Sequence, residues 1–413
     1  MASLQERFRR VRGGVSPTVP LPADSSAETS PPMDGLAARL RRLAPLRAGV
    51  PTRREPDEHA LADRLGAEII APGVLLLTRS RPPAERHGRF RPADAATGLP
   101  ALLPDAIADP GGWAMLDTET SGLAGGTGTW AFVCGLARFQ DDGLLLRQYL
   151  LTRLDAESVF LARLAAELAD ATLLLSYNGK SFDLPLLATR FRLCGIAWDG
   201  ERIAHLDLLH PLRRAFARRW PDCRLGSVET RLLGVRRGGD LPGAEAPAAW
   251  LDWLRRGDGG RLGAVLRHNR VDLVSVAALV PALAAVQRAP GAYGADTGAV
   301  ARHWLRRGDA TRALALLDQA RATLDPSERL LLASLYRRRG EWSQALELWQ
   351  RLAADGEPAA IEALAKYHEY RDVDLTYALA LAQQLPAGPA QQRRCLRLQR
   401  KLRAAGSLNV PAP

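Results

Sequence analysis

Four acidic residues in three short motifs carry the side chains that could do chemistry in this chain. Asp117 and Glu119 lie in Leu-Asp-Thr-Glu-Thr-Ser-Gly, Asp183 in Asn-Gly-Lys-Ser-Phe-Asp-Leu, and Asp272 in His-Asn-Arg-Val-Asp. Carboxylates that a fold brings close together repel one another unless positive charge lies between them. A pair of divalent metal ions supplies that charge in many sites, and its usual chemistry is in-line attack on a phosphodiester.

The first motif predicts two carboxylates that point the same way. Residues two apart on a strand share a face, so Asp117 and Glu119 project together from the end of an apolar strand over 113–117. The Thr-Ser-Gly sequence that follows is a turn that lets the backbone approach a ligand. A Gly-rich segment over 124–129 then leads into the next strand.

The second motif places Asp183 at the start of a helix that follows a strand. The positive end of the helix dipole stabilises a carboxylate there in its charged form, which suits metal ligation. The Gly-Lys-Ser sequence beginning at Gly179 is similar to the end of a phosphate-binding P-loop, but the glycine required five residues earlier is Leu174. The sequence therefore excludes a P-loop nucleotide hydrolase.

The third motif lies on a predicted helix. His268 and Asp272 are four residues apart and share a helix face, so Asp272 can complete the set of carboxylates. His268 would then lie near the attacking water. A histidine titrates near neutral pH and can orient or deprotonate such a water.

Other polar residues admit a structural interpretation as readily as a functional one. Trp130 follows the Gly-rich segment and could stack on a base, or it could belong to the core. Asp207 is interpreted as a helix cap or packing residue. Arginines are dense over 190–237, with Arg213, Arg214, Arg218 and Arg219 closest together. They could bind the phosphate backbone of a nucleic acid or form a solvated helix face.

Taken together, the motifs resemble those of the DEDD, or DnaQ-like, 3′–5′ exonuclease superfamily. The Thr-Ser-Gly-Leu-Ala-Gly-Gly-Thr-Gly-Thr-Trp segment ending at Trp130, with the motifs at Asp183 and Asp272, is similar to the YprB-like ribonuclease H-like family. The resemblance covers about residues 110–285. Members of that family often carry helical repeats behind the nuclease domain.

The resemblance implies a metal-dependent nuclease that hydrolyses DNA or RNA, with 3′–5′ exonuclease action on single-stranded ends by a two-metal mechanism. Two Mg²⁺ or Mn²⁺ ions would be held by Asp117, Glu119, Asp183 and Asp272, because oxygen ligands favour hard ions over zinc. His268 joins these four as a catalytic residue. Residues expected to contact the substrate are Thr118, Thr120, Asn178 and Trp130.

The spacing of His268 departs from the superfamily pattern. The branch with a catalytic histidine places it five residues before the last aspartate, and the branch with a tyrosine places that residue four before. This chain has a histidine at the spacing of the tyrosine. One residue turns a helical side chain by about 100°. Whether His268 acts as general base therefore stays open, with a cap or packing role as the alternative.

The elements that must position these residues alternate between strand and helix over 111–285. Apolar runs predict strands over 113–117, 131–139, 144–151, 172–176 and 203–209, and helices over 156–168 and 184–193. A three-stranded meander followed by helix-linked strands predicts an α/β ribonuclease H-like domain, with a mixed central sheet flanked by helices. Residues 56–110, with a helix over 61–67 and a strand, turn and strand over 68–78, form a small lead-in region. Residues 1–55, rich in Pro and Ser, predict a disordered leader.

The C-terminal part, 295–405, predicts an all-helical domain of tetratricopeptide-like repeats. Gly308 and Gly340 lie 32 residues apart, as do Ala313 and Ala345, and a weaker copy places Ala378 33 residues further. A period near 34 built from helix pairs is typical of tetratricopeptide repeats, and an unrelated helical bundle is the alternative. Such repeats suggest a protein partner.

Composition bounds the class of protein. The chain has 413 residues, 47% of them hydrophobic and 24% charged, and a formal net charge of +11. A basic protein tends to meet polyanions such as nucleic acid, although only three of the basic residues are lysines and GC-rich codon usage explains such a skew equally well. We see no apolar run of membrane-spanning length and no secretory signal, and the four cysteines form no paired motif. We therefore expect a cytoplasmic protein without membrane association, disulfide framework or structural zinc.

Two other functions fit the same residues. A structure-specific endonuclease would use the same fold and carboxylates on an internal bond. A nucleic-acid-binding scaffold would act through its helical repeats without catalysis, but four converging acids argue against a vestigial site.

Overall fold

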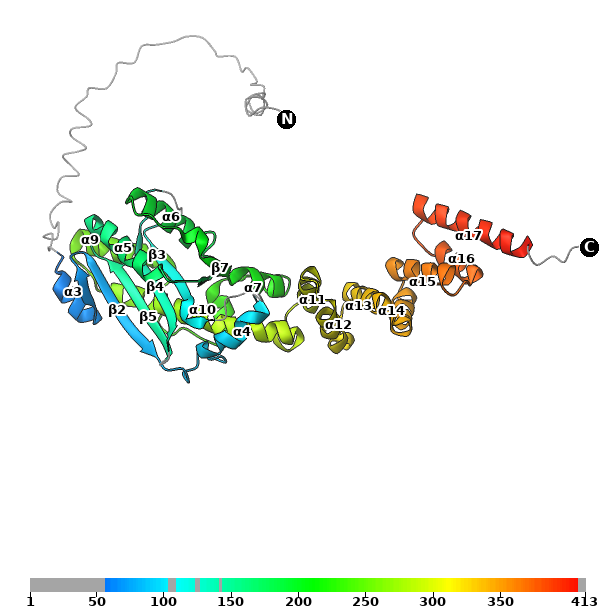
Figure 1. The fold of residues 1–413 in the computed structure, drawn as a ribbon, viewed down its shortest axis with the longest axis horizontal. Helices are drawn as coiled ribbons and strands as arrows, with labels where there is room; N and C mark the ends of the chain where they lie inside the picture. Colours follow the sequence, from blue (N-terminus) through cyan, green and yellow to red (C-terminus); the bar gives the residue numbers. More distant parts are fainter. Residues whose placement is uncertain (1–55, 103–108, 123–126, 141–142, 408–413) are drawn as a thin grey trace, which may run out of the picture. The chain divides into compact units, whose positions relative to one another are not determined.

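One mixed sheet organises residues 56–285 of the computed structural model, in which residues 56–102, 109–122, 127–140 and 143–407 are described (Figure 1). The predicted leader lies outside the described residues. The strands are β1 (Glu68–Ala71), β2 (Val74–Arg81), β3 (Trp113–Thr120), β4 (Ala131–Gln140), β5 (Gly143–Leu151), β6 (Leu173–Ser176) and β7 (Ala204–Asp207). Their order in the sheet is β1-β2-β5-β4-β3-β6-β7.

The sheet is antiparallel from β1 to β3 and parallel from β3 through β6 to β7. The predicted meander and helix-linked strands are thus confirmed, with β3 running on to Thr120. The predicted strand over 203–209 ends at Asp207, because Leu209 begins the next helix. The region over 56–110, expected as a lead-in, supplies β1 and β2 to the same sheet and so belongs to the fold of this domain.

Helices cover both faces of the sheet. They are α3 (Glu58–Leu65), α4 (Ala95–Leu102), α5 (Glu157–Leu168), α6 (Asp183–Leu193), α7 (Leu209–Phe216), α8 (Leu225–Val228), α9 (Ala246–Arg256) and α10 (Leu262–Arg288). Alternate residues of β3 separate the two cores. Trp113 and Met115 pack in a cluster with α4, α7 and most of α10, whereas Ala114 and Leu116 pack in a cluster with α5 and α9. Burial on both faces explains the unbroken apolar run of this central strand.

The long helix α10 is a core element. By length and composition alone it could cross a membrane, but 78% of its most apolar window is buried inside the protein. The expectation that no apolar run reaches membrane-spanning length therefore missed this helix. Its apolar character is explained by its contacts with β3, β4, β5 and α4.

A glycine lets α10 approach the sheet. Gly135 on β4 lies opposite Asp117 on β3 and Gln148 on β5. A Cβ atom at Gly135 would lie 2.2 Å from the Oδ1 atom of Asn269 on α10. The amide of Asn269 fills this space, where it accepts a hydrogen bond of 2.7 Å from Gln148 Nε2. Close approach of backbone to a side chain is a typical use of glycine in a strand.

The C-terminal region is helical, as expected. Its helices are α11 (Thr297–Arg306), α12 (Ala310–Gln319), α13 (Pro326–Arg338), α14 (Trp342–Ala354), α15 (Pro358–Tyr370), α16 (Leu375–Gln383) and α17 (Pro389–Ser407). Successive helices contact each other as the pairs α11–α12, α13–α14 and α15–α16. The fold class, a mixed sheet with flanking helices followed by an all-helical region, is therefore confirmed.

The loops inside the three helix pairs share one backbone feature. Gly308 and Gly340 have φ angles of +82° and +80°, in the left-handed region that follows many helices. In the third pair, the loop position that corresponds to Gly308 and Gly340 is occupied by Val373. This residue is 66% exposed and has a φ angle of +56°. A β-branched residue in this conformation is strained.

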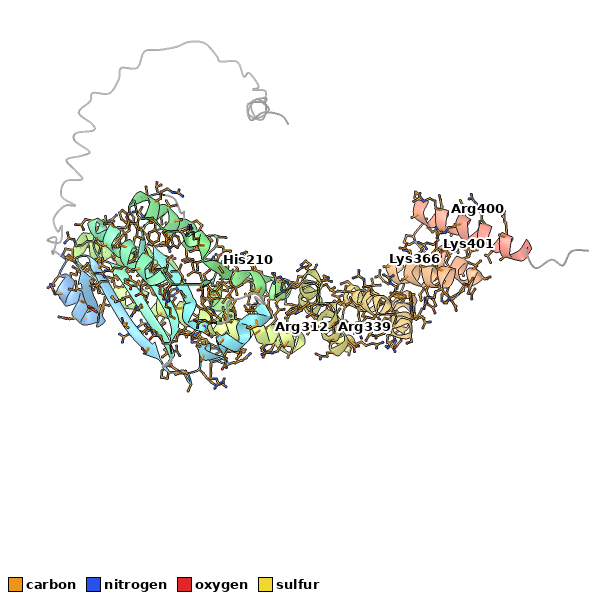
Figure 2. All side chains as sticks on the ribbon, viewed as in Figure 1. His210, Arg312, Arg339, Lys366, Arg400 and Lys401 are labelled. Carbon is orange, nitrogen blue, oxygen red and sulfur yellow. The ribbon has the colours of Figure 1, made fainter. Side chains whose placement is uncertain are left out.

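A buried carboxylate joins the last helix to the third pair. Glu369 on α15 accepts hydrogen bonds from Arg397 and Lys401, both on α17. Figure 2 labels Lys401. Burial raises the pKa of Glu369, but the bonds to Arg397 and Lys401 outweigh burial and lower the pKa to about 2. Glu369 is therefore ionised at any ordinary pH and holds α17 in place.

We predict that Gly135→Ala destabilises the protein by about 1–3 kcal/mol, the usual effect of overpacking a core. The added methyl group would push Asn269 away from Gln148 and separate α10 from β4. Alanine in a strand is otherwise favoured over glycine, so a decrease in stability would indicate overpacking against Asn269. Urea unfolding followed by circular dichroism measures it. Gly291→Ala, where a Cβ meets nothing within 4 Å, is the control; equal midpoints for the two variants would contradict the prediction.

Candidate active site

Strand β3 carries two of the predicted carboxylates to the surface of the sheet. Asp117 keeps part of its surface exposed, whereas Glu119 is 8% exposed. The Oδ2 atom of Asp117 accepts a hydrogen bond of 2.8 Å from Asn269 Nδ2, and the same nitrogen donates to the Asp117 carbonyl oxygen at 3.1 Å. Asn269 therefore fixes the Asp117 carboxylate with its amide nitrogen while its amide oxygen is held by Gln148.

Asp183 begins α6, as predicted, and is tied to the first motif. Its Oδ1 atom accepts hydrogen bonds from the backbone nitrogen of Thr118, at 3.0 Å, and from the Thr118 hydroxyl. Thr118 was expected to contact the substrate, but its side chain here joins the two motifs. The bond links β3 to α6 across 65 residues of sequence.

Asp207 shapes the loop between β6 and α6. Its carboxylate accepts hydrogen bonds from the backbone nitrogens of Asn178 at 2.7 Å, Lys180 at 3.1 Å and Leu209 at 3.0 Å. The third bond reaches Leu209, the first residue of α7, although the N-cap position of this helix is Leu208. The other two bonds hold Asn178 at φ of +69°, a conformation that asparagine tolerates better than most residues.

Helix α10 delivers the third motif beside the first. His268, Asn269 and Asp272 all lie on this helix, and Asn269 was missed by the sequence analysis because an Asn beside a catalytic histidine carries no signal of its own. The Nε2 atom of His268 lies 3.7 Å from Asp272 Oδ2. The four predicted carboxylates and His268 are thus brought together from β3, α6 and α10.

Crowding makes these carboxylates hard to ionise. Burial, followed by repulsion from Asp272 and Asp183, raises the pKa of Glu119 to about 8. Burial and repulsion from the other three carboxylates raise the pKa of Asp117 well above its ordinary value. Burial also raises the pKa of Asp183 and of Asp272, against the lowering effect of their hydrogen bonds. The cluster is therefore short of positive charge.

Arg237 supplies part of that charge. Its guanidinium donates to both carboxylate oxygens of Glu229, to Asp240 at 2.9 Å and to Asp272. Burial lowers the pKa of Arg237, but these acidic partners outweigh burial and raise it. Arg237 thus pairs with three carboxylates. Asp272 is the one among them that belongs to the four predicted metal ligands. No local pattern distinguishes Arg237 from the many other arginines of the chain.

His268 is oriented by a second residue that the sequence analysis missed. Its Nδ1 atom lies 2.8 Å from Asp240 Oδ2 and 3.2 Å from Arg237 Nη1. An ionised carboxylate only accepts hydrogen bonds and a guanidinium only donates them, so Nδ1 can donate to Asp240 or accept from Arg237 but not both. The shorter contact, to Asp240, favours a proton on Nδ1. In a neutral ring Nε2 then carries the lone pair, and it faces Asp272 and, at 3.5 Å from an ideal Cβ position, Gly243.

The donor set fits a hard divalent cation by its chemistry. All four predicted ligands are carboxylates, the oxygen donors that Mg²⁺ and Mn²⁺ take. Their raised pKa values show that added positive charge would be favourable. In the described ranges, however, no three His, Cys, Asp or Glu side chains adopt a metal-binding arrangement. The carboxylate oxygens are engaged in hydrogen bonds within the protein. Asp117 accepts from Asn269, Asp183 from Thr118 and Asp272 from Arg237.

Two cavities meet at the cluster. One, of about 530 Å³, is lined by Asp117, Asp272, Tyr177 and Asn178 together with residues of the segment 209–225. The other, of about 460 Å³, is lined by all three acids of the first two motifs together with Thr118, Thr120, Tyr177 and Asn178. Both volumes lie within the ordinary range of ligand sites. Thr120 and Asn178, expected to contact substrate, thus line cavities beside the carboxylates.

Trp130 lies elsewhere. The guanidinium of Arg190 lies over its ring at 4.0 Å, and Arg190 pairs with the buried Glu157. Trp130 also packs against the core that contains α5 and α9 and does not line either cavity. These contacts agree with the core interpretation of this residue.

Comparison with known proteins gives the family. Residues 114–284 match the family described as the RNase_H superfamily. A family B DNA polymerase from the hyperthermophilic archaeon Pyrobaculum calidifontis aligns with a TM-score of 0.31 and 16% identity, over 55% of this chain and 29% of the polymerase chain. That likeness is too low to carry an argument, and the chain spans less than a third of the polymerase's length.

A sequence relative covers more of the chain. The uncharacterized protein YprB of Bacillus subtilis (strain 168) is 31% identical over 283 residues, which make up 65% of this chain and 68% of YprB. Strands β4, β5, β6 and β7 and nearly all of β3 lie within the residues that match the RNase_H superfamily. The chain therefore belongs to the ribonuclease H-like family of YprB.

Proposed function

We propose that this protein is a metal-dependent nuclease that hydrolyses phosphodiester bonds of nucleic acid, as a 3′–5′ exonuclease of the DEDD type on single-stranded ends. The observation that carries the proposal is the convergence of Asp117, Glu119, Asp183 and Asp272 with raised pKa values. A folded protein has no structural use for four acids that repel one another at a cavity. Membership of a ribonuclease H-like family supports the same chemistry.

The four carboxylates would hold two Mg²⁺ or Mn²⁺ ions. When bound, such ions supply positive charge at the phosphodiester and activate water as a nucleophile. Asn269 and Thr118 hold the carboxylates of Asp117 and Asp183 in place from behind. Arg237 competes for Asp272 but keeps Glu229 and Asp240 as partners, so Asp272 can be released to another cation without stranding the arginine.

His268 would take a proton from the attacking water through Nε2. Asp240 fixes the tautomer that leaves this atom free to accept. The contact between Asp240 and Nδ1 supports this role for a histidine four residues before the last aspartate.

The helix pairs after residue 295 would form a tetratricopeptide-like array that binds a protein partner. The 32- and 33-residue spacing and the contacts within each pair support this assignment.

We predict that Asp117→Asn lowers the rate of strand cleavage at least about a hundredfold, since ligand loss at a metal site removes several kcal/mol of transition-state stabilisation. A panel of 3′- and 5′-labelled single- and double-stranded DNA and RNA, with Mg²⁺, Mn²⁺ or EDTA, measures it. Asp155→Asn, at an exposed carboxylate paired only with Arg153, is the matched control. A wild-type protein that degrades no member of the panel rules the proposal out, and cleavage of a circular strand would instead indicate an endonuclease.

We predict that stability in EDTA falls as the pH rises from about 5 to 8, relative to Glu119→Gln. Glu119 has a pKa of about 8 in the folded protein against an ordinary value of 4.5. The contribution of the protonated side chain to the free energy of unfolding is therefore complete below pH 4.5 and is lost as the pH approaches 8. Glutamine cannot ionise and escapes this loss. Mg²⁺ should raise the melting temperature of the wild type more at pH 8 than at pH 6, because protons compete for the carboxylates.

Differential scanning fluorimetry of both proteins, with and without Mg²⁺, tests this prediction. A pH dependence that is the same for wild type and Glu119→Gln would show that Glu119 is ionised throughout.

We predict that His268→Gln lowers kcat about 10²–10⁴-fold with little change in KM, the usual contribution of a general base. Asp240→Asn should lower kcat less, because it disturbs the tautomer while the ring remains. The pH profile of kcat distinguishes the roles, since the loss of a base removes its acid limb. If His268→Gln cleaves as the wild type does, the histidine has only a packing role.

A further inference from the structure

The two cavities that meet at the carboxylates differ in charge. They share Asp117, Tyr177 and Asn178. We name the cavity of about 530 Å³ the basic arm, because its lining includes the arginines Arg213 and Arg224 beside the acids Asp222 and Asp272. We name the cavity of about 460 Å³ the hydroxyl arm, because its lining includes Thr118, Thr120, Thr129, Ser181 and Thr189 and contains no Lys, Arg or His.

The two arginines of the basic arm are available to a ligand. Both are exposed, and neither guanidinium forms an ion pair or side-chain hydrogen bond with any residue that the structure describes. Their neighbours differ in this respect, since Arg214 contacts His303 at 3.3 Å and Arg218 lies 3.8 Å from Asp296. Only part of the arginine-rich stretch is thus engaged within the protein.

The wall that carries these arginines is built rigidly. The Tyr177 hydroxyl donates a hydrogen bond to the Cys223 carbonyl oxygen, which ties the second motif to the segment before α8. The rings of Phe216 and Trp220 stack with centroids 4.0 Å apart. The Asp222 carboxylate accepts a 3.0 Å hydrogen bond from the backbone nitrogen of Arg224. The guanidinium groups therefore extend from a fixed support beside the carboxylates.

Electrostatics decides what each arm can accept. A nucleic acid strand brings one negative charge per nucleotide, and the acids at the cluster repel it. The part of the strand that leads away from the cluster carries several phosphates, so cationic side chains of the protein must offset the repulsion there. The hydroxyl arm has no such cation. The hydroxyls of Thr118, Thr120 and Thr189 donate within the protein, and their oxygens keep lone pairs that can accept from a sugar or a base.

We propose that the basic arm binds the phosphates of the strand that leads away from the scissile bond, through Arg213 and Arg224, and that the hydroxyl arm receives the terminal nucleoside. This proposal rests on the nuclease function proposed above and adds a polarity to it. The strand then crosses the carboxylates in one direction, with its long part on the arginine side and its end on the Thr118 and Thr120 side.

Strand binding without cleavage tests the proposal. Fluorescence anisotropy would follow fluorescein-labelled single strands of 20 and of 4 nucleotides, as DNA and as RNA, in EDTA at several salt concentrations. The variant is Arg213→Gln/Arg224→Gln. The matched control is Arg219→Gln, an exposed arginine of the same segment that lines neither cavity. Circular dichroism checks that all proteins are folded.

For the double variant we expect affinity for the 20-nucleotide strand to fall at least about tenfold. We also expect the slope of log affinity against log salt to decrease by about 1.4, or about 0.7 for each lost phosphate contact on a single strand. The control should match the wild type. A double variant that binds like the control, an unchanged slope, or a wild type that binds no strand would each overturn the proposal.

The outcome is separable from that of the nuclease proposal. If the wild type binds strands through these arginines but cleaves none with Mg²⁺ or Mn²⁺, strand binding stands and catalysis fails. If the wild type cleaves and the double variant keeps full affinity, catalysis stands and the assignment of the basic arm fails.

Discussion

Repulsion among buried acids is the constraint on which the site depends. Asp117, Glu119, Asp183 and Asp272 repel one another, and Arg237 pairs with Asp272 as well as with Glu229 and Asp240. A single guanidinium cannot balance them, so the remaining charge must be met by protons or by added cations. The raised pKa values record this imbalance. The same imbalance is the basis of the proposed loss of stability at high pH and of the proposed binding of divalent ions.

The fold offsets part of this electrostatic penalty by fixing two of the acids, Asp117 and Asp183, with hydrogen bonds. Gly135 admits Asn269 to the sheet, and Asn269 then holds Asp117. Thr118 holds Asp183 through two bonds, and Asp207 holds the loop that precedes it. None of these supports is itself an acid of the predicted set. Asn269 and Thr118 are neutral donors, so they keep the two carboxylates in place without removing the negative charge on which metal binding would depend.

Local signals in the sequence were sufficient for the elements and the four acids, because each motif sits at the end of an apolar run that also predicts its strand or helix. The supports could not be found in this way. Asn269 and Asp117 are 152 residues apart, and Gly135 acquires its meaning only when α10 lies over β4. The role of Arg237 could not be predicted, because the chain contains many arginines with no local pattern that distinguishes this one. The lead-in region was separated from the domain because strand pairing between β2 and β5 has no local signal.

The valine in the third loop of the helical region has a consequence for how this region opens. A left-handed conformation costs a non-glycine residue about 1–2 kcal/mol, and the exposed side chain of Val373 recovers none of it through burial. The ion pairs of Glu369 with Arg397 and Lys401 then add to the packing of α15 against α16 in holding this end together. Fraying of the array should begin at its C-terminal end and leave the first two pairs intact, so a ligand seated there would survive conditions that melt the tail.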